Sequence, residues 1–298
     1  MAVRASADET GTMTDEAMSD SLPARHPVVC FVALAYGWAW ACWLPLLADR
    51  QDWVTWTAPA FLHLAGGLGP AIGALVVTAA LRGRAGVGAL LSACAAWRGR
   101  LGLLAVAGLG PLALFGAAVS AARAIEGTWP SLAEFGASTE YATLPLPIYW
   151  AANLVCYGYG EEIGWRGFLQ PWLQRRRSAL TAAAGVSVVW ALWHLPLFWI
   201  TPTYRAMPAA GFVGFYFSLL VGALVLAWLF IAGRGSILVV ALFHAVFDIA
   251  TTTPTTTKLI PTLTGAAITV VGLATVPYLA RIPAVGNLSQ PEGRPDAA

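Results

Sequence analysis

Residues 211–232 read GFVGFYFSLLVGALVLAWLFIA and contain no charged side chain. About 20 apolar residues in an α-helix match the roughly 30 Å hydrocarbon core of a bilayer, so this segment predicts a membrane-spanning helix. Similar apolar runs cover residues 28–48, 58–81, 101–122, 146–169, 179–200, 236–253 and 259–280. Long unbroken runs favour helices over a barrel, whose strands would alternate over short segments. The sequence therefore predicts an all-α polytopic membrane bundle of about eight transmembrane helices. The Thr-Thr-Thr-Pro interruption at 251–254 leaves seven or nine spans open.

The composition is that of a chain surrounded mostly by lipid. Of 298 residues, 58% are hydrophobic and only 11% are charged, against about 25% charged residues in soluble domains. A net charge of +2 shows no basic excess and excludes nucleic acid as a partner. The lipid bilayer is the expected partner instead. The four cysteines lack CxxC spacing, which predicts small packing residues rather than disulfides or a thiolate zinc site. They are Cys30, Cys42, Cys94 and Cys156.

Polar ends flank the apolar region. Residues 1–27 are acidic with few large apolar side chains, so burial cannot offset the entropy cost of ordering them. They are predicted to form a disordered cytoplasmic tail. Residues 28–281 form the helix bundle, and residues 282–298 form a second disordered tail.

Arginines concentrate in alternate loops, and cytoplasmic loops are the ones that retain positive charge. The rich loops hold Arg82, Arg84, Arg98, Arg100, Arg175, Arg176, Arg177 and Arg234. The opposite loops hold only Arg50, Arg123, Arg205 and Lys258. This distribution predicts a multi-pass protein of the cell membrane with both termini cytoplasmic.

Six ionisable residues lie inside the apolar runs, where each costs roughly 2.5 to 3.5 kcal/mol on insertion scales. They are Glu161, Glu162, Arg166, His194, His244 and Asp248. Any one of them can serve as a helix–helix hydrogen bond or a structural ion pair. The combined insertion cost of all six is larger than a purely structural role would require, so they predict a functional site. His26 and His63 lack such company and are expected to be tail, loop or interface residues.

Spacing divides these residues into groups. Glu162 and Arg166 are four positions apart and share a helix face, whereas Glu161 is rotated by about 100° and is not neutralised by that pair. His244 and Asp248 are also four apart and share a face. Pro196 follows His194 by two residues and is expected to kink the helix there.

Carboxylates and histidines in a site of low water content can activate a single water against an amide carbonyl. Glu161 is the expected general base and His194 the expected second holder of that water. His244 and Asp248 are expected to stabilise the oxyanion or hold the substrate carbonyl. Zinc stays open as a cofactor, because Glu161, His194 and His244 can supply three ligands with a fourth position free. The helical HExxH motif is absent, and a metal-free mechanism fits the residues equally well.

The pattern EExxxR, an aromatic-xxxH and HxxxN/D in three successive hydrophobic blocks resembles the CAAX prenyl endopeptidase and bacteriocin-processing (CPBP) family. The resemblance covers residues 140–255, and the segment GPAIGA at 69–74 also looks like the family. It implies an intramembrane protease bundle of eight helices over 28–281. It also implies that Glu161 and His194 activate water and that Glu162 and Arg166 organise the first motif. His244 and Asp248 then line the other side.

Two positions depart from the family pattern. Trp190 stands where Phe is usual, which keeps an aromatic packing role and narrows the pocket. Asp248 stands where Asn is frequent, and an ionised Asp cannot donate to an oxyanion. It must be protonated or act by orienting His244.

The resemblance also bears on substrates. Family members are named metalloproteases. Eukaryotic relatives imply a prenylated C-terminal tail, whereas bacterial relatives imply peptide or bacteriocin maturation, self-immunity or membrane-protein turnover. The expected partner is a peptide or membrane-protein substrate, with lipidation left open.

Two other functions compete with proteolysis. A proton-coupled transporter can use Glu and His as a relay, although no internal repeat is found. A non-catalytic membrane scaffold would show an eroded motif, and here the motif is intact. A hydrolytic site should converge at one depth, whereas a relay should run across the bilayer.

Overall fold

The computed structural model describes residues 22–286, and the regular structure within this range is entirely helical, with no strand. The N-terminal helices are α2 (Leu22–Arg25), α3 (Pro27–Arg50), α4 (Phe61–Gly67), α5 (Gly69–Ala93) and α6 (Leu101–Glu126). The central helices are α7 (Leu146–Asn153), η1 (Leu154–Tyr159), α8 (Gly160–Gly164), η2 (Trp165–Leu169), α9 (Gln170–Gln174) and α10 (Ala179–Trp193). The C-terminal helices are α11 (Leu197–Ile200), α12 (Pro202–Arg205), α13 (Ala209–Ala232), α14 (Ile237–Thr252) and α15 (Leu259–Ala280). The predicted all-α membrane bundle is confirmed.

Every apolar run predicted to span folds as a helix within the described chain. Six helical stretches are long and apolar enough to cross a membrane. They are Pro27–Arg50, Phe61–Ala93, Leu101–Glu126, Ala179–Ile200, Ala210–Ala232 and Leu259–Ala280. The other two predicted spans take a different form. Helix α14 has 16 residues. Residues 146–174 form one helical rod, in which the π-helical segments η1 and η2 alternate with α-helical segments.

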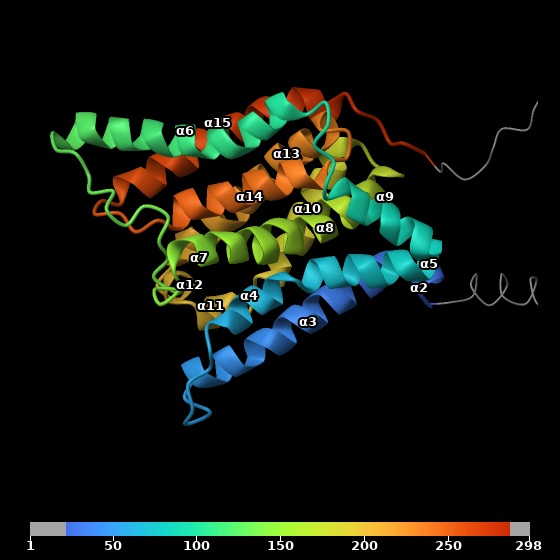
Figure 1. Ribbon diagram of the computed structural model, residues 1–298, viewed down its shortest axis with the longest axis horizontal. Helices are drawn as coiled ribbons and strands as arrows, with labels where there is room; N and C mark the ends of the chain where they lie inside the picture. The colour runs from blue at the N-terminus through green and yellow to red at the C-terminus, as the bar shows by residue number, and fades with distance from the viewer. Residues whose placement is uncertain (1–21, 287–298) are drawn as a thin grey trace, which may run out of the picture.

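The rod from α7 to α9 and helix α14 lie side by side through the middle of the bundle (Figure 1). Helices α3 and α5 pack together on one side, with α5 against α8. Helix α6 packs on α14 and α15, and α13 lies between α10 and α15. Because the rod and α14 occupy the middle of the bundle, protein surrounds their charged residues.

Glycines allow the close approach of these helices. A Cβ atom on Gly164 would lie 2.4 Å from Cβ of Pro70, and one on Gly158 would lie 2.7 Å from the carbonyl oxygen of Ala241. Small residues let membrane helices pack backbone to backbone. The segment at 69–74 therefore supports the rod that carries the glutamates.

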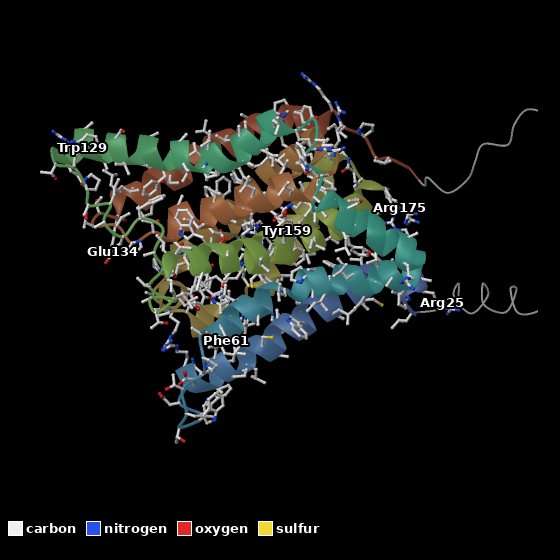
Figure 2. All side chains as sticks on the ribbon, in the orientation of Figure 1. Arg25, Phe61, Trp129, Glu134, Tyr159 and Arg175 are labelled. Carbon is white, nitrogen blue, oxygen red and sulfur yellow. The ribbon has the colours of Figure 1, made fainter. Side chains whose placement is uncertain are left out.

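Both described chain ends lie at the same end of the bundle, to the right in Figure 1. Arg25 and Arg175 lie at that end, and Trp129 and Glu134 lie at the opposite end (Figure 2). This arrangement agrees with the even number of crossings predicted from the sequence. The predicted tails fall largely outside residues 22–286, and the described part of the first contains the short helix Leu22–Arg25.

Candidate active site

The two glutamates sit on a helical turn bounded by π-helices. Helix α8 carries Glu161 and Glu162 between η1 and η2, and all five of its residues are buried. An extra residue per turn changes the direction in which following side chains point, and π segments are frequent at functional sites. Here the turn directs the two neighbouring carboxylates to different partners.

Glu162 is held in a buried charge network. Its Oε1 atom accepts from Arg166 Nη1 at 2.9 Å and from His244 Nδ1 at 2.8 Å. Glu162 and Arg166 are both fully buried. The ion pair predicted from their spacing is therefore confirmed, and the contact to His244 ties α14 to the rod.

Glu161 is bound by two tryptophans instead. Trp165 Nε1 donates to Oε2 at 3.0 Å, and Trp190 Nε1 donates to the same oxygen. Among the described residues no protein donor reaches the other oxygen, Oε1. Glu161 is thus fixed by one oxygen and leaves the second without a protein donor within residues 22–286.

His194 lies where α10 ends, directly after Trp193. Its Nδ1 atom is 2.8 Å from the carbonyl oxygen of Trp190. A carbonyl only accepts, so Nδ1 carries the proton, and neutral His194 has a lone pair on Nε2. The rings of Trp193 and Phe215 hold the imidazole at centroid distances of 4.9 Å and 5.5 Å. The helix break expected near Pro196 is present, because α11 begins at Leu197.

The two ring nitrogens of His244 face different carboxylates, Nδ1 toward Glu162 and Nε2 toward Asp248. Asp248 Oδ2 lies 3.6 Å from Nε2 of the histidine, beyond hydrogen-bond distance but close enough for attraction. The Trp190 ring stands edge-on to His244 at 5.5 Å and lies 5.1 Å from the Arg166 guanidinium. Trp190 therefore contacts all three sequence motifs, whereas sequence reasoning gave it only a packing role.

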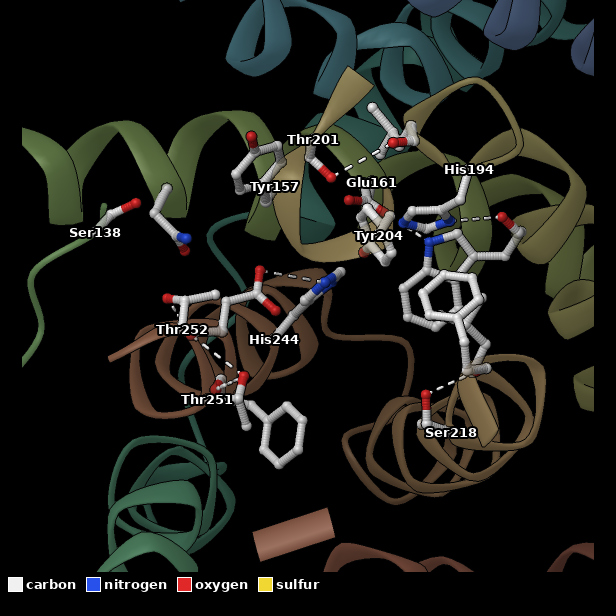
Figure 3. A pocket seen from close by; sticks show the side chains of 18 of the residues that line it. Ser138, Tyr157, Glu161, His194, Thr201, Tyr204, Ser218, His244, Thr251 and Thr252 are labelled. Atoms are coloured by element: carbon white, nitrogen blue, oxygen red, sulfur yellow. Dashed lines mark hydrogen bonds and ion pairs between the residues drawn. The ribbon is translucent and has the colours of Figure 1, made fainter. Parts of the chain in front are cut away.

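A cavity of about 470 Å³ opens at this point inside the bundle. Glu161, His194, His244 and Asp248 line it, and Glu162 and Arg166 lie behind its wall. Figure 3 shows Glu161, His194 and His244 directed toward the same space. The structure thus brings four of the six predicted residues to one cavity and places the other two as support.

His63 corrects the sequence interpretation. It was expected to lack ionisable company, but its Nδ1 lies 2.7 Å from Glu140 Oε1, and both residues line the cavity. Beside them the Tyr141 and Tyr157 hydroxyls are hydrogen-bonded at 2.8 Å. Burial raises the pKa of Tyr141 well above its usual range, so its hydroxyl stays protonated. A lone histidine at the start of a span gave no signal of this contact, because Glu140 reaches it from a loop 77 residues away.

The donors considered for zinc do not gather around one point. Among residues 22–286, no group of three His, Cys, Asp or Glu side chains could hold a metal ion. Glu161 has one oxygen committed to two indoles, and His244 Nδ1 is committed to Glu162. These donors do not fit a preformed zinc site.

Known proteins similar to this chain match it in the segment that carries the site residues. The family described as Type II CAAX prenyl endopeptidase Rce1-like matches residues 143–250. That segment contains all six ionisable residues of the predicted site. Residues 143–250 resemble this CAAX endopeptidase family. The predicted resemblance is confirmed there.

A relative of this chain is the CAAX prenyl protease 2 of Methanococcus maripaludis, which is 28% identical over 119 residues. The aligned region covers 39% of this chain and 42% of the relative. The chain therefore spans less than half of that relative's length in the alignment. The CAAX-protease likeness applies to the central rod, α10, α13 and most of α14.

Proposed function

We propose that this chain is an intramembrane endopeptidase that hydrolyses peptide bonds with a water activated by Glu161 and His194. The observation that carries the proposal is the convergence of Glu161, His194 and His244, from three separate helices, on one cavity inside an apolar bundle. The likeness of residues 143–250 to the Rce1-like CAAX endopeptidase family supports the same reaction class.

The first step uses Glu161 Oε1 and His194 Nε2, two atoms for which no hydrogen bond is found within residues 22–286. Glu161 Oε1 accepts a proton from a water whose second hydrogen points to His194 Nε2. The water oxygen forms a bond to the carbonyl carbon of the peptide, and the carbonyl electrons move to its oxygen. Two indole donors on Oε2 keep the carboxylate in place during the transfer. General base catalysis of this kind contributes typically 10²- to 10⁴-fold.

Collapse of the tetrahedral intermediate returns the proton. The carbonyl re-forms, the carbon–nitrogen bond breaks, and Glu161 gives its proton to the leaving amine nitrogen. The products are a new carboxylic acid and a new amine. Glu161 ends the cycle ionised, ready for the next water.

His244 faces the developing oxyanion. Its Nδ1 proton is bound by Glu162, and Asp248 next to Nε2 favours a proton on that nitrogen as well. A protonated Nε2 can donate to the oxyanion, so Asp248 acts by orienting and charging His244 rather than as a donor. Glu162 and Arg166 fix the ring from behind the cavity wall.

We further propose that the substrate is a peptide or membrane protein, lipidated or plain, that reaches the cavity from the bilayer or the cytoplasm. The cavity lies within a multi-pass bundle, which favours substrates held at the membrane. Arg25 and Arg175 at the end that carries both chain ends support cytoplasmic termini in the cell membrane.

The transporter alternative is less well supported. A proton relay needs ionisable groups spaced across the bilayer. Here Glu161, His194, His244 and Asp248 surround one cavity. A scaffold would not need Glu161 to keep one oxygen without a protein donor.

The proposal is tested with purified protein in detergent and a library of fluorogenic peptides, prenylated and plain. Mass spectrometry identifies the cut bond and the gain of one water across the two products. Glu161→Ala and His194→Ala are expected to lose cleavage, and Glu134→Gln, which changes a loop carboxylate outside the cavity, is expected to keep it. No cleavage by folded wild-type protein across the library would refute the proposal.

A further inference from the structure

The cavity has two walls of different chemistry. Helices α13 and α15 supply apolar or small residues, among them Leu219, Gly222, Leu226, Gly265 and Ile268. The opposite wall comes from the loop before α7, from α7 itself and from the end of α14. It includes Ser138, Glu140, Tyr149, Asn153, Asp248 and Thr252. In Figure 3, Ser138, Tyr157 and Thr252 lie on one side of the cavity, and His194 and Ser218 lie on the other.

Three hydroxyls of the polar wall donate their protons to other protein groups. Thr252 Oγ1 donates to the carbonyl oxygen of Asp248 at 2.7 Å. Tyr149 lies 3.3 Å from that same Oγ1, and a threonine hydroxyl has only one proton, so Tyr149 is the donor of this bond. Thr251 Oγ1 donates to the carbonyl of Phe247 at 2.9 Å. These three hydroxyls therefore offer lone pairs to a ligand rather than protons.

Asn153 adds an acceptor that has no partner. Its side chain is buried, with 1% exposed, and no hydrogen bond within residues 22–286 reaches Oδ1. An unpaired buried polar atom costs about 1–3 kcal/mol. Asn153 lines the cavity, and an unpaired acceptor on such a residue points to a ligand that brings a donor.

Carboxylates complete the wall. Glu140 and Asp248 are acceptor-only groups when ionised, with side chains 33% and 27% exposed. His63 uses its Nδ1 proton on Glu140. Within the described chain no Lys or Arg lines the cavity. The wall therefore combines acceptors with two carboxylates, whose basic neighbours within the described chain are His63 and His244 rather than Lys or Arg.

We propose that this polar wall is a specificity subsite for a cationic side chain, Lys or Arg, of the cleaved peptide. An ammonium brings three N–H donors and a guanidinium brings five, which matches a wall of acceptors around two carboxylates. The inference rests on the proposed endopeptidase function. It adds that a basic residue near the scissile bond selects the substrate, with Asn153 and Glu140 as specificity-determining residues.

The test is a set of otherwise identical fluorogenic peptides that carry Arg, citrulline, Lys, norleucine or Glu at each position around the cut. Citrulline keeps much of the shape and the N–H donors of Arg but removes its charge. At one position the wild-type kcat/KM is expected to be about 10- to 100-fold higher for Arg or Lys than for norleucine, the range of charge-assisted hydrogen bonds. Citrulline should fall between them, and Glu should be poorest.

Substitutions in the polar wall test which residues cause the preference for a basic side chain. Glu140→Gln and Asn153→Leu are expected to lower the Arg-to-norleucine ratio at that position by about tenfold, whatever the absolute rate. Glu140→Gln changes a partly exposed side chain and tests the inference even if Asn153→Leu fails to fold. The matched control Glu134→Gln should leave the ratio unchanged.

The outcomes separate the subsite from the reaction. Cleavage of all the peptides with equal kcat/KM, or a charge preference unaffected by Glu140→Gln and folded Asn153→Leu, overturns the subsite and leaves the endopeptidase standing. Failure of folded wild-type protein to cut any peptide overturns the endopeptidase and the subsite with it.

Discussion

The substitution Glu162→Gln should lower the free energy of unfolding far more than the same change at the neighbouring Glu161. Glu162 is the partner of the Arg166 guanidinium, which is fully buried. Arg166 Nε and Nη2 have no other hydrogen-bond partner within the described chain. Loss of the Glu162 charge would leave the guanidinium with an amide oxygen, the charge of Glu161 and the Trp190 ring 5.1 Å away, but without its ion-pair partner.

The magnitude follows from this isolation. Breaking a buried ion pair by removing one partner costs about 3–5 kcal/mol, and the amide oxygen that remains places Glu162→Gln toward the lower part of that range. Glu161→Gln keeps an amide oxygen for both indole donors and should cost about 1 kcal/mol or less. A double variant, Glu162→Leu with Arg166→Leu, removes both charges and should recover most of the lost stability.

The assay is reversible unfolding of the detergent-solubilised protein, followed by tryptophan fluorescence. The difference between Glu162→Gln and Glu161→Gln should be at least about 2 kcal/mol, with partial recovery in the double variant. Equal destabilisation by the two glutamine variants, or a double variant less stable than Glu162→Gln, would refute the assigned division of roles.

Three further outcomes are expected. Trp190→Phe should retain cleavage within about tenfold of wild type in kcat/KM, because Trp165 still donates to Glu161 and an aromatic ring remains; a complete loss would contradict this. Gly164→Ala should lower the free energy of unfolding by about 1–3 kcal/mol, since its Cβ would overlap Pro70. Gly116→Ala, with open space around its Cβ, is the control in the same melt, and equal loss in both would be inconsistent with the packing. Cleavage should persist after dialysis against a strong chelator and metal analysis, and a loss restored by added zinc would show that the donors rearrange to bind metal.

The sequence was informative where the physical cause is local. Apolar runs of about 20 residues predicted each span, because lipid demands internal backbone hydrogen bonding and apolar side chains. The cost of ionisable groups in lipid singled out Glu161, Glu162, Arg166, His194, His244 and Asp248. The i to i+4 spacing also predicted the ion pair of Glu162 with Arg166, which the structure contains.

The parts that sequence could not predict depend on tertiary approach. The bond from Trp190 to Glu161 requires α10 to lie against α8, and nothing in an aromatic-xxxH pattern fixes the partner of an indole N–H. The pairing of His63 with Glu140 depends on the path of a loop across the cavity. The first π segment, Leu154–Tyr159, changes the register of the rod without a proline to signal it, whereas Pro171 follows the second.

The most direct test of the account is the kcat/KM of Glu161→Gln on a peptide that the wild type cuts, with the folding of both proteins matched by fluorescence. The account predicts a loss of at least about 10²- to 10⁴-fold, because the amide cannot take the proton of the attacking water. Cleavage by Glu161→Gln at the wild-type rate would contradict the claim that Glu161 is the general base.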